Sequence, residues 1–204
     1  MKTSHAILAA ALTIAASAGA AQAQSLDNSQ RNNANIRAQL NATISDVTGD
    51  VSATSAAIAN SFTAEGSGLA TLNNYQNFWG DAQSALTATI SDVDGDVSAT
   101  SAAIANSASI EGEWVGVLNN TQLAGYDPTS NLNATITDVG GDVASTSAAL
   151  SNSASIDTDF GRLASTQINQ AGVYANMTAT VRDVGGSVTA TAAAIGNSLT
   201  VTGF

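Results

Sequence analysis

LTATISDVDGDVSATSAAIANS, residues 86–107, is the stretch that decides the fold, because related stretches occur three more times along the chain. They begin at Leu40, Leu132 and Met177, so the four starts are 46, 46 and 45 residues apart. A fixed period of this length is typical of repeat proteins, in which each unit stacks on the next. We therefore expect full repeats over 40–85, 86–131 and 132–176, and half repeats over 24–39 and 177–204.

The half repeat at 24–39 carries a second motif, Leu-x-Asn-x-Gln, which ends at Gln30. The motif returns after each of the first three core stretches, with Ser165 in place of Asn in its last copy. Its Gln positions are again 46, 46 and 45 residues apart. Because both motifs keep the same step, we expect 24–204 to form a single repeat domain.

Each unit opens on the pattern of a half-buried strand. Residues 86–91 alternate Leu-Thr-Ala-Thr-Ile-Ser, which places apolar side chains on one face and hydroxyls on the other. In the next run, Val97–Ile110, the apolar positions change parity, so a strand there needs a corner or bulge, expected near Ser101–Ala103. We predict an all-β fold, a β-solenoid built from repeats of about 46 residues. The alternative is an α+β fold with an Ala-rich helix in each repeat, which the interspersed Ser and Thr disfavour.

An acidic turn follows the first strand of each unit and reads Asp-Val-Asp-Gly-Asp at 92–96. Asp and Gly suit a tight corner, because both tolerate positive φ and Asp can cap backbone groups. The alternative is a calcium site at Asp92, Asp94 and Asp96, since stacked carboxylates attract a hard cation. The spacing is not that of an EF-hand, because Gly95 is not at the sixth position and no Glu stands at the twelfth. We expect no cofactor, with calcium as the alternative.

Two sets of amide side chains fall on positions whose parity is otherwise apolar. Identical amides stacked along a sheet can donate to and accept from one another, which offsets the cost of burying them. We therefore predict two structural ladders; the alternative places these residues in turns, where Asn is common. The predicted members are Asn60, Asn106, Asn152 and Asn197, and Gln30, Gln76, Gln122 and Gln167.

The N-terminus predicts a secretory signal peptide over 1–23. Lys2 precedes an apolar run at 6–16 that is too short to span a membrane, and Ala21-Gln22-Ala23 suits a cleavage site. Cleavage removes the only Lys and the only His, and the chain contains no Cys. Catalysis by His, Lys or Cys and zinc sites built from Cys or His are then excluded, so we expect no enzyme and no catalytic residue. Four Arg against 16 acidic residues disfavour nucleic acid as a partner.

The repeated phrases Ala-Thr-Ile-x-Asp-Val and Ala-Ala-Ile-x-Asn-Ser resemble those of secreted alphaproteobacterial surface proteins. These include components of holdfast-anchoring complexes, which are similar to curlin-type fibre subunits. The resemblance covers roughly 26–204, although the curlin repeat Ser-x5-Gln-x-Gly-x-Asn-x-Ala-x3-Gln is absent. It implies a secreted protein at the extracellular or cell surface of a Gram-negative bacterium, with a role in adhesion and biofilm and in amyloid-like fibres.

We expect a secreted, self-assembling structural subunit of a fibre or adhesive anchor. The predicted mature chain begins with the second half of a unit and stops after a first half, so copies stacked head to tail would complete each other. The expected partners are other copies of the chain, outer-membrane secretion or anchor proteins, and polysaccharide. The alternative is a secreted binding module that recognises polysaccharide or ice through a Thr- and Asn-rich face containing Thr87 and Thr89.

Overall fold

The computed structural model describes residues 12–15, 24–66 and 68–203, and within these ranges it contains strands and turns but no helix. The Ala-rich helix is therefore wrong: residues 97–124 form one long strand that pairs on both sides. The strands are β1 (Leu12–Ala15), β2 (Gln24–Asn32), β3 (Ile36–Val47), β4 (Val51–Glu65), β5 (Leu69–Phe78), β6 (Ala82–Val93), β7 (Val97–Ala124), β8 (Thr129–Val139), β9 (Val143–Asn169), β10 (Tyr174–Val184) and β11 (Val188–Thr202).

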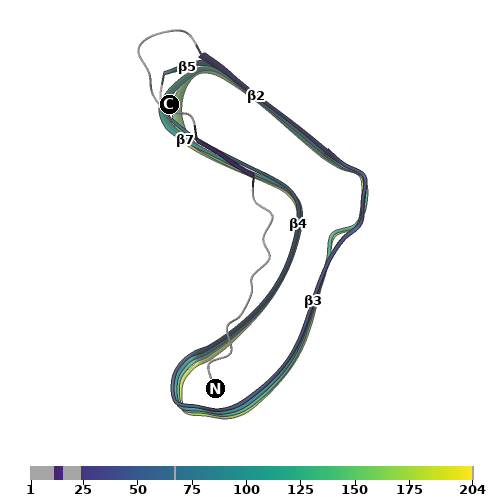
Figure 1. The fold of residues 1–204 in the computed structure, drawn as a ribbon, viewed down its shortest axis with the longest axis vertical. Helices are drawn as coiled ribbons and strands as arrows, with labels where there is room; N and C mark the ends of the chain where they lie inside the picture. Colours follow the sequence, from purple (N-terminus) through teal and green to yellow (C-terminus); the bar gives the residue numbers. More distant parts are fainter. Residues whose placement is uncertain (1–11, 16–23, 67, 204) are drawn as a thin grey trace.

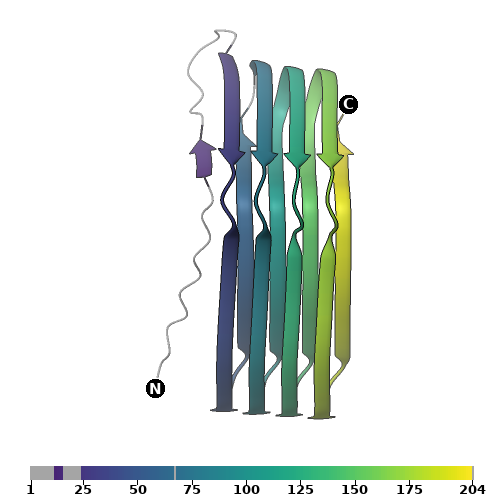
Figure 2. The ribbon, with the colours of Figure 1, turned by 90° about the vertical axis from the view of Figure 1, so that its right-hand side faces the viewer.

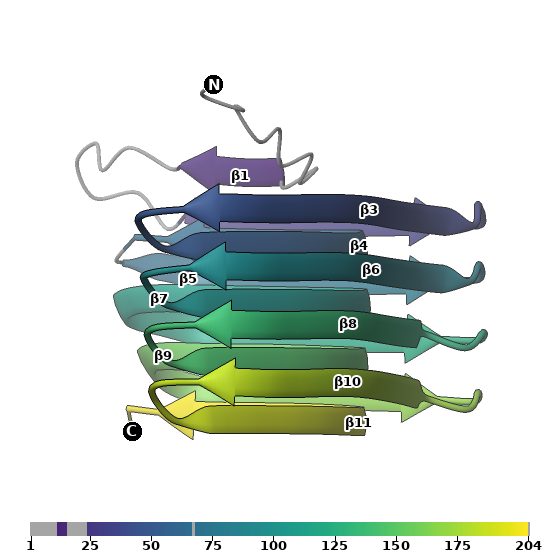
Figure 3. The same cartoon turned by 90° about the horizontal axis from the view of Figure 1, so that it is seen from below.

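All strand pairs are parallel and form two sheets. One sheet has the order β10-β8-β6-β3, and the other contains β1, β4, β7, β5 and β2, with β9 beside β7 and β11 beside β9. Strands with equivalent sequence lie side by side from the N-terminal to the C-terminal end (Figures 2 and 3). In β3, β6, β8 and β10 this register stacks Leu40, Leu86, Leu132 and Met177. The chain is thus an all-β, solenoid-like stack of parallel strands.

The interior is narrow and built from small or branched side chains. Viewed down the stack, the strands superimpose on one bent outline, with β3 facing the first part of β4 and β2 facing its last part (Figure 1). Two hydrophobic clusters fill the two halves of this outline. Leu86, Ile90 and Val97 belong to the first, and Phe62 and Leu72 belong to the second. Each fully buried Leu, Ile or Phe contributes about 1.5–3 kcal/mol from apolar burial.

The parity change in the long strand lies further along than the sequence predicts. Buried positions alternate up to Ala105 and then shift to Asn106, and the pairing with β4 omits Ala105. The prediction of a bulge near Ser101–Ala103 is therefore wrong. Ala105 belongs to a third small cluster with Phe78. The long strand therefore turns at a point where the small side chain of Ala105 fits between the two larger clusters. Ile104 lies on the outer face, because the shift comes after it and not before it.

The predicted signal peptide, 1–23, lies outside the described residues except for β1, which pairs with Phe62–Glu65 of β4. Within the described ranges, no helix has the length and hydrophobicity that a membrane span requires.

Candidate functional site

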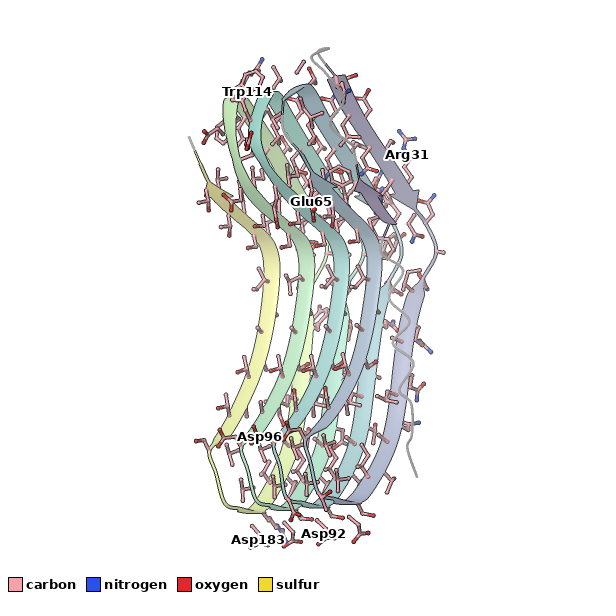
Figure 4. The ribbon with its side chains drawn as sticks, turned by 60° about the vertical axis from the view of Figure 1, so that its left-hand side comes forward. Arg31, Glu65, Asp92, Asp96, Trp114 and Asp183 are labelled. Carbon is pink, nitrogen blue, oxygen red and sulfur yellow. The ribbon has the colours of Figure 1, made fainter. Side chains whose placement is uncertain are left out.

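The acidic turns occupy the same corner of the outline, where Asp92 and Asp183 lie (Figure 4). The first Asp of each turn has a left-handed backbone, with φ of 57° at Asp46 and 54° at Asp92. Asp tolerates this conformation because its short polar side chain can form local hydrogen bonds. The prediction that the turn glycines have positive φ is wrong. The positive-φ glycines of the described chain are Gly66, Gly68 and Gly203.

The turn glycines are required by close approach between neighbouring turns. A Cβ on Gly95 would collide with the Asp50 side chain and lie 2.7 Å from the carbonyl carbon of Gly49. The Asp50 Oδ1 in turn accepts a hydrogen bond of 2.9 Å from the Asp96 backbone N–H. Each carboxylate of this set therefore caps the backbone of the following turn, and the glycine leaves room for it.

The three candidate calcium ligands do not form a metal site. Asp96 is engaged, because its Oδ1 accepts a hydrogen bond of 2.8 Å from the backbone N–H of Asp142. A groove of about 440 Å³ runs beside the turns and is lined in part by Asp50, Asp96 and Asp142. Over the described ranges, no group of three or more His, Cys, Asp or Glu could hold a metal ion, so Asp92, Asp94 and Asp96 are not assembled as ligands.

The predicted Asn ladder residues lie inside strands and not in turns. We call them the Asn column: Asn60, Asn106, Asn152 and Asn197. Each Nδ2 donates to the Oδ1 of the next residue toward the C-terminal end, at 2.8 Å in all three contacts. Asn106 and Asn152 are completely buried. These amides are satisfied by one another, which makes their burial tolerable.

The Gln residues form a second set within strands, here called the Gln column: Gln30, Gln76, Gln122 and Gln167. Their hydrogen bonds run in the opposite direction, because each Nε2 donates to the Oε1 of the preceding residue at 2.8–3.0 Å. Gln76 and Gln122 are fully buried. Because the two columns donate in opposite directions, the two ends of the stack present different free donors and acceptors.

Both columns also join the two walls of the interior. Gln122 Nε2 donates to the Ser153 carbonyl at 2.8 Å, and Asn106 Nδ2 donates to the Leu123 carbonyl at 2.9 Å. Asn106 and Gln122 thus each use one N–H along the stack and one across the core. A buried carbonyl left without a donor costs about 1–3 kcal/mol, so these cross-core bonds hold the two walls together.

A third buried column was missed by the sequence reasoning. Asn28 donates to Asn74 at 2.6 Å, Asn74 donates to Asn120 at 2.7 Å, and Asn120 donates to the Ser165 hydroxyl at 3.1 Å. The signal was present in the Leu-x-Asn-x-Gln motif, because period two places the Asn on the same face as the Leu and the Gln.

The comparisons with known proteins identify the family. The family model for holdfast attachment protein D matches residues 2–162, which is most of the chain. The chain belongs to the holdfast attachment protein D family. The resemblance to holdfast-anchoring proteins drawn from the repeats is thereby confirmed. No curated protein matched the chain, and no solved structure matched it.

Membership of this family makes the chain a holdfast-related adhesion component with a cell-surface or extracellular location. The family is structural and is associated with other holdfast components. The site relevant to such a protein is a surface that joins it to a neighbour, and the two ends of the stack are such surfaces.

The C-terminal end of this family member exposes apolar side chains. Most of the large hydrophobic residues that are at least 38% exposed lie in the last strands, at the end of β9 and in β10 and β11. The exposed residues of this end are Ile168, Tyr174, Val188, Ile195 and Leu199. Val188 and Leu199 continue columns that are buried in the inner strands, whereas the other three continue outer-face columns that are half-buried there. Exposed apolar patches of this kind are typical of interaction surfaces.

Proposed function

We propose that the chain is a secreted structural subunit of a holdfast attachment assembly, and that copies of it stack head to tail into a fibre. In this proposal residues 1–23 are removed on export, and each unit of about 46 residues forms one turn of a β-solenoid. The free backbone groups of the outermost strands then become the contacts between copies.

The observation that carries this proposal is the open space around Gly49. A Cβ on Gly49 would have nothing within 4 Å, and its φ is not positive. Neither space nor backbone conformation within the chain requires glycine there. Its equivalents Gly95, Gly141 and Gly186 each lie against the preceding turn. Glycine at position 49 has the same use if the last turn of another copy, with its own Gly186, lies against it.

The hydrogen-bonding groups of the two ends are complementary in this arrangement. At the N-terminal end, Asn60 uses its N–H to donate to Asn106 and so presents an acceptor oxygen, whereas Gln30 uses its oxygen to accept from Gln76 and so presents a donor N–H. At the C-terminal end, Asn197 presents a donor and Gln167 presents an acceptor. Continuing the register places Asn60 of one copy on Asn197 of the other, and Gln30 on Gln167.

The predicted cleavage removes the one strand that lies in the way. β1 pairs along Phe62–Glu65 of β4, where an incoming β11 would pair in the continued register. Loss of 1–23 would leave this edge open. Val188 and Leu199, which are exposed at the C-terminal end, would then be covered by the first strands of the next copy, and their burial would favour association.

The test uses Gly49→Ala in the exported protein, with its N-terminus established by mass spectrometry. We expect the wild type to form filaments above a critical concentration in negative-stain microscopy. Gly49→Ala should keep the wild-type melting temperature and raise that critical concentration about tenfold or more, since a Cβ collides only in the assembly. Filaments of Gly49→Ala at the wild-type critical concentration would contradict the proposal.

A second candidate function is a binding module for polysaccharide or ice, and one feature favours it. Thr43, Thr89, Thr135 and Thr180 are exposed and in register on the outer face of β3, β6, β8 and β10. Binding of neutral polysaccharide by monomeric protein, unaffected by salt and lost on replacing Thr89 and Thr135 with Val, would support this function in place of assembly.

A further inference from the structure

The arginines at the two ends of the chain have different surroundings. At the N-terminal end, Arg31 lies over the Tyr75 ring at 5.5 Å and Arg37 donates to Gln83 Oε1 at 2.6 Å. The side chains of Arg162 and Arg182, in the last strands, form no hydrogen bond or ion pair with any described residue. Both are exposed. Two cations without a partner thus lie at the end that we propose to receive another copy.

The acidic corner also changes at this end. Each of the first three turns carries two or three Asp and no basic residue at or directly before the turn. In the last turn Arg182 precedes Asp183, and Ser187 stands where the earlier turns have the capping Asp. The last corner therefore has no net charge, whereas stacking onto it brings the Asp46 and Asp50 carboxylates of the next copy.

We propose that Arg182 and Arg162 recognise two carboxylates at the N-terminal end of a second copy of this chain, with Arg182 contacting Asp46 and Arg162 contacting Asp27. This inference rests on the proposed head-to-tail stacking. Arg182 shares its register column with Ser45, so Asp46 of the next copy is one residue away. Neighbouring strands lie about 4.8 Å apart, which is within reach of an arginine side chain.

The second pair lies on the opposite wall. Arg162 is in register with Val117, Thr71 and Ser25, which places Asp27 of the next copy two residues along the strand. Residues at i and j±2 on one face of neighbouring strands are about 7–8 Å apart, which long side chains can bridge. Asp27 is exposed and accepts from Asn73 Nδ2 at 2.6 Å, which leaves its second oxygen for the arginine.

The two pairs give the contact a direction. Joining two like ends would reverse the direction of the facing strands, so neither arginine would lie beside the carboxylate that it faces in head-to-tail stacking. Opposite charges at the correct contact speed its formation. The two pairs therefore form only in head-to-tail joining.

A charge swap tests the inference. Arg162→Asp makes both facing positions negative, and Asp27→Arg makes both positive, so each variant alone should raise the critical concentration for filaments about tenfold. An equal mixture of the two variants should assemble as an alternating copolymer near the wild-type critical concentration, because every contact then joins opposite charges. The double variant in one chain should also recover.

Arg182→Gln tests the other pair, with Asn131→Asp on the exposed face of β8 as its control of equal charge change. Arg182→Gln should weaken assembly about twofold to fivefold and Asn131→Asp should not. Filaments from wild type together with unchanged assembly of Arg162→Asp and Arg182→Gln would overturn this inference and leave the stacking proposal standing. Absence of filaments from wild type would overturn both.

Discussion

Asn106→Asp replaces the side-chain NH2 group of a fully buried amide with an oxygen atom, and the shape of the side chain hardly changes. In the native chain Asn106 donates one N–H to Asn152 Oδ1 at 2.8 Å and another to the Leu123 carbonyl at 2.9 Å. An ionised carboxylate can make neither bond, so both acceptors lose their donor. Orphaned buried acceptors cost about 1–3 kcal/mol each, which sets a loss of at least about 2 kcal/mol.

For a domain of this size, 1 kcal/mol corresponds to about 2–4 °C in melting temperature, so we expect Asn106→Asp to lower it by at least about 4–8 °C. Burial raises the pKa of the introduced carboxyl above its ordinary value, and a protonated group restores one donor. Stability of the variant should therefore fall as pH rises from the unfolded-state pKa of this carboxyl to its higher folded-state pKa, and the deficit should be smaller at about pH 4 than at pH 7.

Asn133→Asp is the matched control, because Asn133 is exposed on β8. Circular dichroism or calorimetry of both variants at the two pH values provides the measurement. A melting temperature of Asn106→Asp equal to that of Asn133→Asp would refute the reasoning that the Asn column holds the core together.

Gln122→Leu leaves Gln76 Oε1 and the Ser153 carbonyl without a donor, so it should lower the melting temperature by a similar amount, and an unchanged value would contradict the cross-core role. Gly95→Ala should destabilise the monomer by about 1–3 kcal/mol in denaturant unfolding through collision with the preceding turn; equal stability would show that this turn can relax. Deleting 24–39 should abolish filament growth and leave a folded strand-rich chain, and normal filaments from it would contradict stacking at that end. The wild-type far-ultraviolet spectrum should be dominated by strand, and helical minima would contradict the fold.

The fold class followed from the sequence because the period and the alternation are local signals. The pattern of residues 86–91 identifies a half-buried strand without knowledge of its neighbours. The position of the bend in β7 could not be predicted from the sequence. Ala105 and Asn106 are both buried because β7 packs against Phe78 of β5 at this point. The alternation within β7 carries no information about a residue of another strand.

The polar interior was partly predictable for a related reason. The Asn and Gln columns were found because amides stood on apolar parity at a fixed step. Their second bonds, such as Asn106 to the Leu123 carbonyl, cross from wall to wall and have no signal in the repeat. The role of the turn glycines was also hidden, because a close approach between Gly95 and Asp50 can be seen only after the turns are stacked.

The axial repeat of filaments tests the central claim most directly. One copy contributes the four stacked strands β3, β6, β8 and β10 to one sheet. At about 4.8 Å between strands, head-to-tail stacking predicts a subunit rise of roughly 19 Å by cryo-electron microscopy, with strands perpendicular to the filament axis. A protein that remains monomeric at all concentrations, or filaments whose strands run along the axis, would contradict the account.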